Sequence, residues 1–161
     1  YGENAGEVEA LFPAQSDSEV KQSMDRLVTQ MGFGASARFT AECMDKMGEP
    51  AYLYLFTMAP QDPRVQQLGT FHGLEIMYVF GNLDMMGLEG TGEADYALSE
   101  AMMEYWTAFA ASGDPNGGGT SVQGPAYTPD AAEYLELGEA INTASNLFQE
   151  AYELVKEINS L

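Results

Sequence analysis

The residue of this 161-residue chain best suited to chemistry is His72, because it is the only histidine in the sequence. A neutral imidazole can accept a proton near pH 7 and return it later, which is the work of a general base and acid. Gly69 and Gly73 flank it and favour a loop with unusual backbone angles. A lone histidine is nevertheless more often structural or superficial than catalytic, so the residue type alone leaves both interpretations open.

A nucleophile to match this histidine is not apparent, since the sequence contains no G-x-S-x-G elbow. The nearest match, Gly34-Ala35-Ser36-Ala37-Arg38, lacks the last glycine and falls in a predicted helix. The triplet Gly117-Gly118-Gly119 has the composition of an oxyanion loop, but we interpret it as a flexible turn. Cys43 is the only cysteine, which excludes an internal disulfide or a cysteine-based metal site and favours a small buried apolar residue.

The chain is strongly acidic, with 25 acidic residues, six basic residues and a net charge of −19. After Arg64 the next basic side chain is Lys156. Such a surface repels phosphate backbones and anionic lipids, so no nucleic-acid or membrane-surface partner is expected. The acidity favours solubility, with steering of cationic substrates as the alternative. Hydrophobic residues make up 45% of the chain, enough for a packed core, and no apolar run is long enough to span a membrane.

Apolar spacing and turn residues predict helices and short strands, with His72 after one of the strands. The continuous apolar run 51–58 predicts a buried central strand, and His72 follows it on a loop. Residues 81–92 are predicted to form a second loop. The other predicted elements are helices over 18–31, which Gly32 should end, and over 35–47, 74–80, 93–112 and 146–158, and short strands over 133–137 and 141–145.

Four stretches, which follow one another at a specific spacing, carry a family resemblance. They are AYLYLF at 51–56; GTFHGLE at 69–75 with YVFG at 78–81; YWTAFA at 105–110 with GDPN at 113–116; and PAY at 125–127 with YLELG at 134–138. Together they resemble the C-terminal region of type-B carboxylesterases, the cholinesterase-like group of α/β-hydrolases. The resemblance covers nearly the whole chain and departs at Gly124, where the family usually has tryptophan, a change expected to alter loop packing.

The resemblance implies that residues 1–161 are the C-terminal portion of one α/β-hydrolase domain, mostly helices around the strand at 51–58 plus two short strands. It matches His72 to the catalytic histidine of a serine, acid and histidine triad. The serine and the acid are then expected upstream of Tyr1, in the remainder of a parent chain. The implied substrate is a small-molecule carboxylic ester, and no cofactor is implied. The family favours a secreted or periplasmic location.

The residues around His72 take further roles from the resemblance. Glu75 matches a buried glutamate behind the site, with Gly73 beside it, and this interpretation is favoured over the alternative of a helix-start carboxylate stabilised by the helix dipole. A possible gorge wall is formed by Phe71, Leu74, Met85 and Met86. For the two methionines a loop packed on the body is an equal alternative. The aromatic residues Tyr105, Trp106 and Phe109 are expected in the core rather than at a ligand.

Three functions remain open from the sequence. The first is a serine esterase whose C-terminal part supplies the catalytic histidine and is inactive alone. The second is a non-catalytic, cholinesterase-like binding or adhesion protein. The third is a free-standing acidic domain that resembles the family only by chance. Retention of His72 favours the enzyme.

Overall fold

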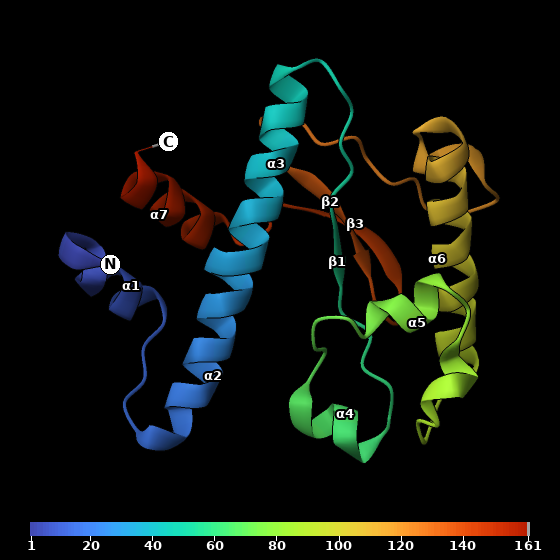
Figure 1. The fold of residues 1–161 in the computed structure, drawn as a ribbon, viewed down its shortest axis with the longest axis horizontal. Helices are drawn as coiled ribbons and strands as arrows, with labels where there is room; N and C mark the ends of the chain where they lie inside the picture. Colours follow the sequence, from blue (N-terminus) through green and yellow to red (C-terminus); the bar gives the residue numbers. More distant parts are fainter. Residues whose placement is uncertain (161) are drawn as a thin grey trace. The chain divides into compact units, whose positions relative to one another are not determined.

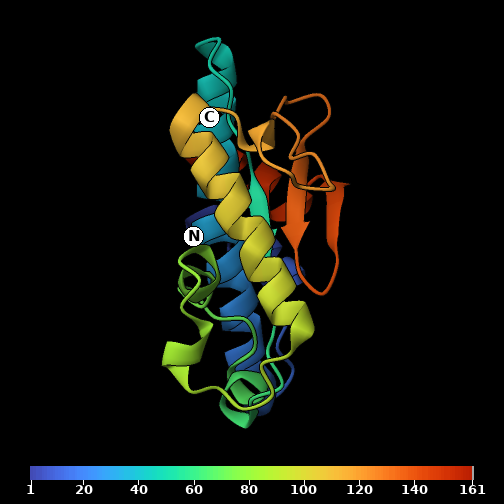
Figure 2. The same cartoon turned by 90° about the vertical axis from the view of Figure 1, so that its right-hand side faces the viewer.

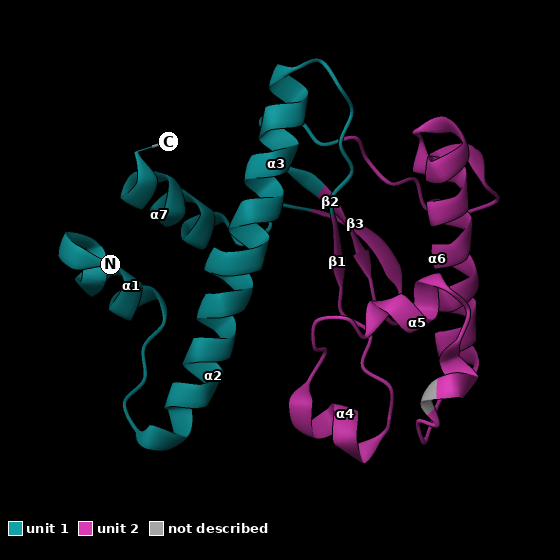
Figure 3. Ribbon diagram, viewed as in Figure 1, with its two compact units in different colours: residues 1–53, 127–133, 145–161 teal, residues 54–126, 134–144 magenta. Residues whose placement is uncertain are grey.

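A computed structural model describes residues 1–160, with the side chain of Met86 excepted (Figure 1). The chain forms two compact units, which are coloured separately in Figure 3. Unit 1 comprises residues 1–53, 127–133 and 145–161, and unit 2 comprises residues 54–126 and 134–144. The chain therefore passes from unit 1 to unit 2 and back twice, and each unit is described by itself.

Unit 1 is helical. Its elements are the 3₁₀ turn η1 (Gly2–Asn4), α1 (Ala5–Leu11), α2 (Asp17–Leu27), the π-helical segment η2 (Val28–Gly34), α3 (Ala35–Lys46) and α7 (Gln149–Asn159). The helices predicted over 18–31, 35–47 and 146–158 are present, although the last begins only at Gln149 and the first continues past residue 31, and α1 was not predicted.

The helix through α2, η2 and α3 is continuous, so the prediction that Gly32 ends a helix is wrong. The junction residues Val28 and Gly34 both have right-handed helical angles. A glycine lowers helix propensity without forcing a break, and here the helix continues through Gly32 in the wider turns of a π-helix. The helix ends instead at Lys46, and Gly48 in the turn that follows has a φ of +78°, which glycine adopts readily.

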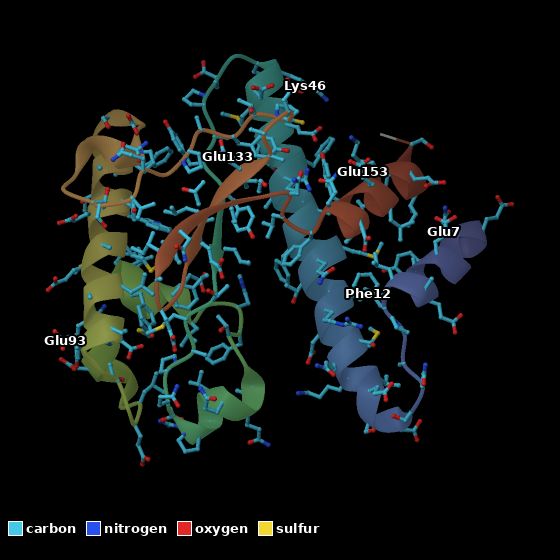
Figure 4. All side chains as sticks on the ribbon, turned by 180° about the vertical axis from the view of Figure 1, so that it is seen from behind. Glu7, Phe12, Lys46, Glu93, Glu133 and Glu153 are labelled. Atoms are coloured by element: carbon cyan, nitrogen blue, oxygen red, sulfur yellow. The ribbon has the colours of Figure 1, made fainter. Side chains whose placement is uncertain are left out.

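The main core of unit 1 lies where α1, η2 and α7 meet. It consists of Val8, Phe12, Met31, Ala151 and Leu154. Figure 4 labels Phe12 at the end of α1 and shows the acidic side chains of Glu7 and Glu153 on the same unit. Three apolar side chains of α2 and the start of η2 remain about half exposed, namely Val20 at 47%, Met24 at 50% and Val28 at 46%.

Unit 2 combines helices with a three-stranded sheet. Its elements are β1 (Tyr54–Phe56), α4 (Pro63–Leu68), α5 (Glu75–Val79), the 3₁₀ turn η3 (Leu83–Met86), α6 (Glu93–Ser112), the 3₁₀ turn η4 (Pro115–Gly117), β2 (Glu133–Leu137) and β3 (Ile141–Ser145). The predicted bounds of α6, β2 and β3 are confirmed, α5 lies within its predicted range, and α4 was not predicted.

The sheet has the strand order β1-β2-β3, and β1 runs parallel to β2 with Tyr54 opposite Leu135 and Phe56 opposite Leu137. The prediction of a buried central strand over 51–58 is wrong in length and in burial. Only Tyr54–Phe56 is strand, and Tyr54 is 41% exposed. The reason is that β1 has a strand partner on one side only within the described residues, so it forms a sheet edge.

Helix α6 covers one face of this sheet, and Figure 2 looks at unit 2 with the yellow α6 nearest to the viewer. Leu98, Met102 and Tyr105 of α6 belong to one core cluster with Leu135 and Leu137 of β2. Two residues near the ends of α6 lie outside this core. Ala94 is exposed and Phe109 is 49% exposed, because they lie at the ends of α6, where its buried stripe turns away from the core.

The loop after α6 is held by Asn116, which belongs to the GDPN motif. Its side-chain amide donates to the carbonyl of Gly124 at 2.9 Å, and its oxygen accepts from the Gly124 amide at 2.7 Å. Gly124 is buried, with Pro115 and Leu135 nearby. At the position where the resembling family usually has tryptophan, the Gly124 backbone is therefore held by the Asn116 side chain and lies beside apolar atoms of Pro115 and Leu135.

Candidate active site around His72

His72 lies in the turn that leads into α5, and its side chain is exposed. The chain reaches it from the end of β1 through α4. Both flanking glycines have backbone angles that other residues rarely adopt, with φ of +74° at Gly69 and +94° at Gly73. The sequence therefore correctly indicated a tightly turning loop at this position.

Glu75 and Gly73, which the sequence placed beside His72, are brought together by a hydrogen bond. The Glu75 carboxylate accepts from the Gly73 amide at 2.9 Å. The bond fixes the turn immediately after His72 and places a negative charge at the start of α5, where the helix dipole favours it. The same carboxylate, together with burial as the larger cause, raises the pKa of the Tyr54 hydroxyl on β1.

The residues predicted for a gorge wall differ in exposure. Phe71 is 37% exposed and Met85 is 81% exposed, so both present apolar surface. Leu74 is fully buried in the core of unit 2 and supports the His72 turn from within. The side chain of Met86 lies outside the described residues.

The aromatic residues of α6 divide between core and surface. Tyr105 is buried, and its hydroxyl donates to the carbonyl of Val122 at 2.6 Å. Trp106 packs against the core and meets the Tyr54 ring edge-on, with 5.0 Å between the ring centres. The core role predicted for Tyr105 and Trp106 is confirmed, and for Phe109 it is wrong because half of that side chain is exposed.

Asp62 organises the loop before His72, and sequence inspection missed it. Its carboxylate is 1% exposed and accepts from the Arg64 guanidinium at 2.9 and 2.7 Å, from the Arg64 amide at 2.7 Å and from the Glu89 amide at 2.9 Å. The Arg64 guanidinium also donates to the carbonyl of Gly87. These bonds, with that from the Arg64 side chain as the largest cause, hold the pKa of Asp62 well below its usual range. The one local signal was Asp62-Pro63, a pairing typical of a helix start.

A second buried cluster fixes α5 against α6. The Tyr78 hydroxyl donates to the Asp95 carboxylate at 2.6 Å, and Ser99 donates to the Tyr78 carbonyl at 2.7 Å. The other oxygen of Asp95 accepts from the Gly92 amide at 2.9 Å and so caps α6. Burial, followed by the hydrogen bond to Asp95, raises the pKa of Tyr78. The sequence did not predict the contact between Tyr78 and Asp95, because the two residues lie 17 positions apart on different helices.

The other candidate residues have structural surroundings. Ser36, from the near match to a nucleophile elbow, donates to the Gly32 carbonyl at 2.6 Å within the long helix. Gly117 ends η4, and Gly118 and Gly119 follow it beside Glu104. Cys43 is half-buried rather than fully buried in α3. Among residues 1–160, no three acidic, cysteine or histidine side chains group as metal ligands, and no helix is long and apolar enough to cross a membrane.

Comparisons with known proteins identify relatives at the level of sequence. A model of the carboxylesterase family matches residues 9–155. Carboxylesterase 5A of Felis catus is 34% identical over 150 residues, which cover 89% of this chain and 27% of that protein. Acetylcholinesterase 1 of Caenorhabditis elegans is 33% identical over 121 residues, covering 71% of this chain and 19% of that protein.

Solved structures show the same likeness in three dimensions. A carboxylesterase of Geobacillus stearothermophilus superposes with a TM-score of 0.75 at 25% identity, covering 92% of this chain and 31% of that one. A PNB esterase superposes with a TM-score of 0.73 at 26% identity, covering 92% of this chain and 29% of that one. The chain thus spans less than a third of the length of the proteins that it matches.

Proposed function

The chain belongs to the carboxylesterase family, and from this membership we propose that it supplies His72 as the general acid and base of a serine carboxylic-ester hydrolase. The observation that carries the proposal is the position of this sole histidine. It lies on an exposed turn, beyond the β1 strand of a parallel pair, within the ordered motifs that resemble the family. The substrate we propose is a small-molecule carboxylic ester.

The proton transfers follow from the chemistry of an ester. The imidazole accepts the proton of a serine hydroxyl as that oxygen attacks the ester carbonyl, and then donates it to the departing alcohol. It next accepts a proton from the water that hydrolyses the acyl-enzyme. The serine, the carboxylate partner of His72 and the oxyanion hole would come from the remainder of the hydrolase, so we expect this chain by itself to be inactive.

The surroundings of His72 suit this role. The Glu75–Gly73 hydrogen bond restrains the backbone next to the imidazole, as a general base requires, since it must stay within hydrogen-bond reach of the nucleophile. The apolar surfaces of Phe71 and Met85 could contribute a wall that contacts the acyl or alcohol part of the ester.

A hybrid enzyme tests the proposal. The matched region of the Geobacillus stearothermophilus carboxylesterase is replaced by this chain, and hydrolysis of a short-chain nitrophenyl ester is measured. We expect activity in the hybrid and a loss of about 10²- to 10⁴-fold or more in its His72→Ala variant. The isolated chain serves as the inactive control. Undiminished turnover in the His72→Ala hybrid would refute the role of His72 and favour the non-catalytic binding function.

A further inference from the structure

The segment between β1 and His72 is a loop whose two ends are joined by one side chain. The Thr70 hydroxyl lies 3.1 Å from the carbonyl of Met58 and 3.3 Å from that of Thr57, and it can donate its single hydrogen to either. Inside this closure, the Gln66 amide donates to the carbonyl of Pro60 at 3.0 Å. The chain thus leaves the sheet at residue 58 and returns to the same point two residues before His72.

The carbonyls that accept from Thr70 belong to a fixed part of unit 2. The Thr57 amide donates to the Leu137 carbonyl at 2.8 Å and so continues the pairing of β1 with β2. The Met58 side chain is 5% exposed and lies in the main core of the unit. Through Thr70, the backbone near His72 is therefore fastened to the end of the sheet.

The backbone around His72 needs such an attachment, because Gly69 and Gly73 place a permissive residue on either side of residues 70–72. On the C-terminal side, the Glu75 carboxylate holds the Gly73 amide. On the N-terminal side, Gly69 comes first, and the Thr70 side chain attaches the residue after it to the end of β1. The three residues between the glycines are thus held from both directions.

We propose that Thr70 is a positioning residue for His72. Its hydrogen bond to the end of β1 sets where the imidazole lies relative to that strand. This inference rests on the proposed function, in which the imidazole must meet a nucleophile at a defined place. A displacement of about 1 Å at a reacting group can lower a rate by roughly a hundredfold. Thr70 itself touches no reacting atom in this scheme.

Thr70 is suited to a local role rather than to a general role in stability. It is exposed, so water can replace its hydrogen bonds at little cost to the folded state. The interior of the loop is held independently by Asp62, through its bonds to Arg64 and Glu89. Removal of the Thr70 hydroxyl should therefore loosen the attachment of residues 70–72 without unfolding the unit.

The experiment uses the imidazole of the whole chain as its own probe, because a single histidine gives one unambiguous Cε1–H signal. Nuclear relaxation of this signal is measured in the wild type, in Thr70→Val, which keeps the shape without the donor, and in Thr70→Ala. Thr70→Ser keeps the hydroxyl. Thr107→Val is the matched control, since Thr107 is also exposed and donates to a backbone carbonyl, that of Met103 at 2.7 Å.

We expect both Thr70→Val and Thr70→Ala to lower the order parameter of the imidazole and to speed amide exchange at residues 71–73, with unchanged unfolding midpoints. Thr70→Ser and Thr107→Val should behave as the wild type does. Imidazole mobility in Thr70→Val equal to that of the wild type would overturn the proposal. An equal rise in Thr107→Val would overturn it as well.

The hybrid enzyme separates this inference from the proposed function. There, Thr70→Val should lower kcat about tenfold with KM little changed, and Thr70→Ser should restore kcat. Loss of activity in His72→Ala with full activity in Thr70→Val would reject Thr70 alone. Full activity in His72→Ala would reject the proposed function, and the relaxation measurement would still decide whether Thr70 fixes His72.

Discussion

Arg38 in unit 1 and Asp62 in unit 2 are both charged side chains with almost no exposed surface, 3% and 1%, but their partners differ. The Arg38 guanidinium donates to two neutral oxygens, the Leu147 carbonyl at 3.0 Å and the Gln149 side chain at 2.8 Å. It also lies 4.2 Å from the centre of the Tyr152 ring. Asp62 instead accepts from a charged guanidinium and from two backbone amides.

The hydrogen-bond partners of Arg38 and Asp62 differ because the two side chains hold different kinds of structure in place. Arg38 joins α3 to the start of α7 and to the turn before it, through two neutral acceptors and the face of an aromatic ring. Asp62 lies in an irregular loop whose amides have no helix or sheet partners, and a carboxylate can accept several of them at once. Unit 2 therefore uses a buried charge to shape the loop that leads to His72, whereas unit 1 uses one to pack helices.

Unit 2 also contains two Tyr–Asp hydrogen bonds of nearly equal length, one buried and one at the surface. Tyr78 donates to Asp95 at 2.6 Å in the core, and Tyr96 donates to Asp84 at 2.5 Å at the surface. Water competes for the hydrogen-bonding groups only at the surface. The length of a bond alone should therefore not predict how much it contributes to the free energy of unfolding.

Asp62→Asn should cause the largest fall in the unfolding midpoint, because a carboxamide turns one acceptor toward the donors that now bind the carboxylate. The effect has a pH signature. Since the folded-state pKa of Asp62 lies below its unfolded value of about 3.9, its stabilisation is complete above that pH and is lost as the pH falls toward the folded value.

Urea unfolding between pH 7 and pH 2.5 measures this signature. Asp62→Asn should flatten part of the acid-side loss of stability, whereas Glu7→Gln, at an exposed carboxylate of α1, should leave it as in the wild type. Parallel acid-side curves for the wild type and Asp62→Asn would contradict the prediction.

Arg38→Ala should lower the free energy of unfolding by about 3 kcal/mol, because it leaves the buried Leu147 carbonyl without this donor, removes the bond to Gln149 and removes the packing on Tyr152. Chemical denaturation measures the change. Arg26→Ala, at an exposed position of α2, is the control and should change stability by less than about 0.5 kcal/mol. Equal effects at the two arginines would mean that the buried contacts of Arg38 contribute nothing.

Tyr78→Phe should lower the free energy of unfolding by about 2 kcal/mol, since the buried Asp95 carboxylate loses its hydroxyl donor. Tyr96→Phe removes the surface bond of similar length and should give no resolvable change. Thermal and urea unfolding of the pair measure the difference. If both variants lose the same stability, burial does not govern the strength of these bonds.

Gly34→Ala and Gly32→Ala should have opposite signs although both lie in η2. A Cβ at Gly34 would lie 2.4 Å from the ring of Phe148, which costs about 1 to 2 kcal/mol. At Gly32 the nearest atom is Val28 Cγ1 at 4.0 Å, so alanine should stabilise the helix by up to about 1 kcal/mol. Circular dichroism during urea unfolding measures both, and a destabilised Gly32→Ala would contradict the continuous helix.

Local sequence patterns predicted the regular elements well where the spacing of apolar residues alone decides between helix and strand. The apolar spacing of residues 93–112 and the short runs at 133–137 and 141–145 gave α6, β2 and β3 with their observed bounds. The same reasoning failed at Gly32, where a π-helical segment carries the helix onward, and at 51–58, where apolar composition suggested burial that an edge strand does not provide.

The sequence by itself determined the family and the α/β-hydrolase fold that the esterase structures confirm, because residue types and their order along the chain suffice for these, and the role of His72 stays a prediction from it. Only the tertiary structure decided how the His72 turn is held. The attachments of Thr70 to the end of β1, of Asp62 to the Glu89 amide and of Tyr78 to Asp95 join residues 12 to 27 positions apart. Such bonds depend on distances set by packing, and no local propensity encodes them.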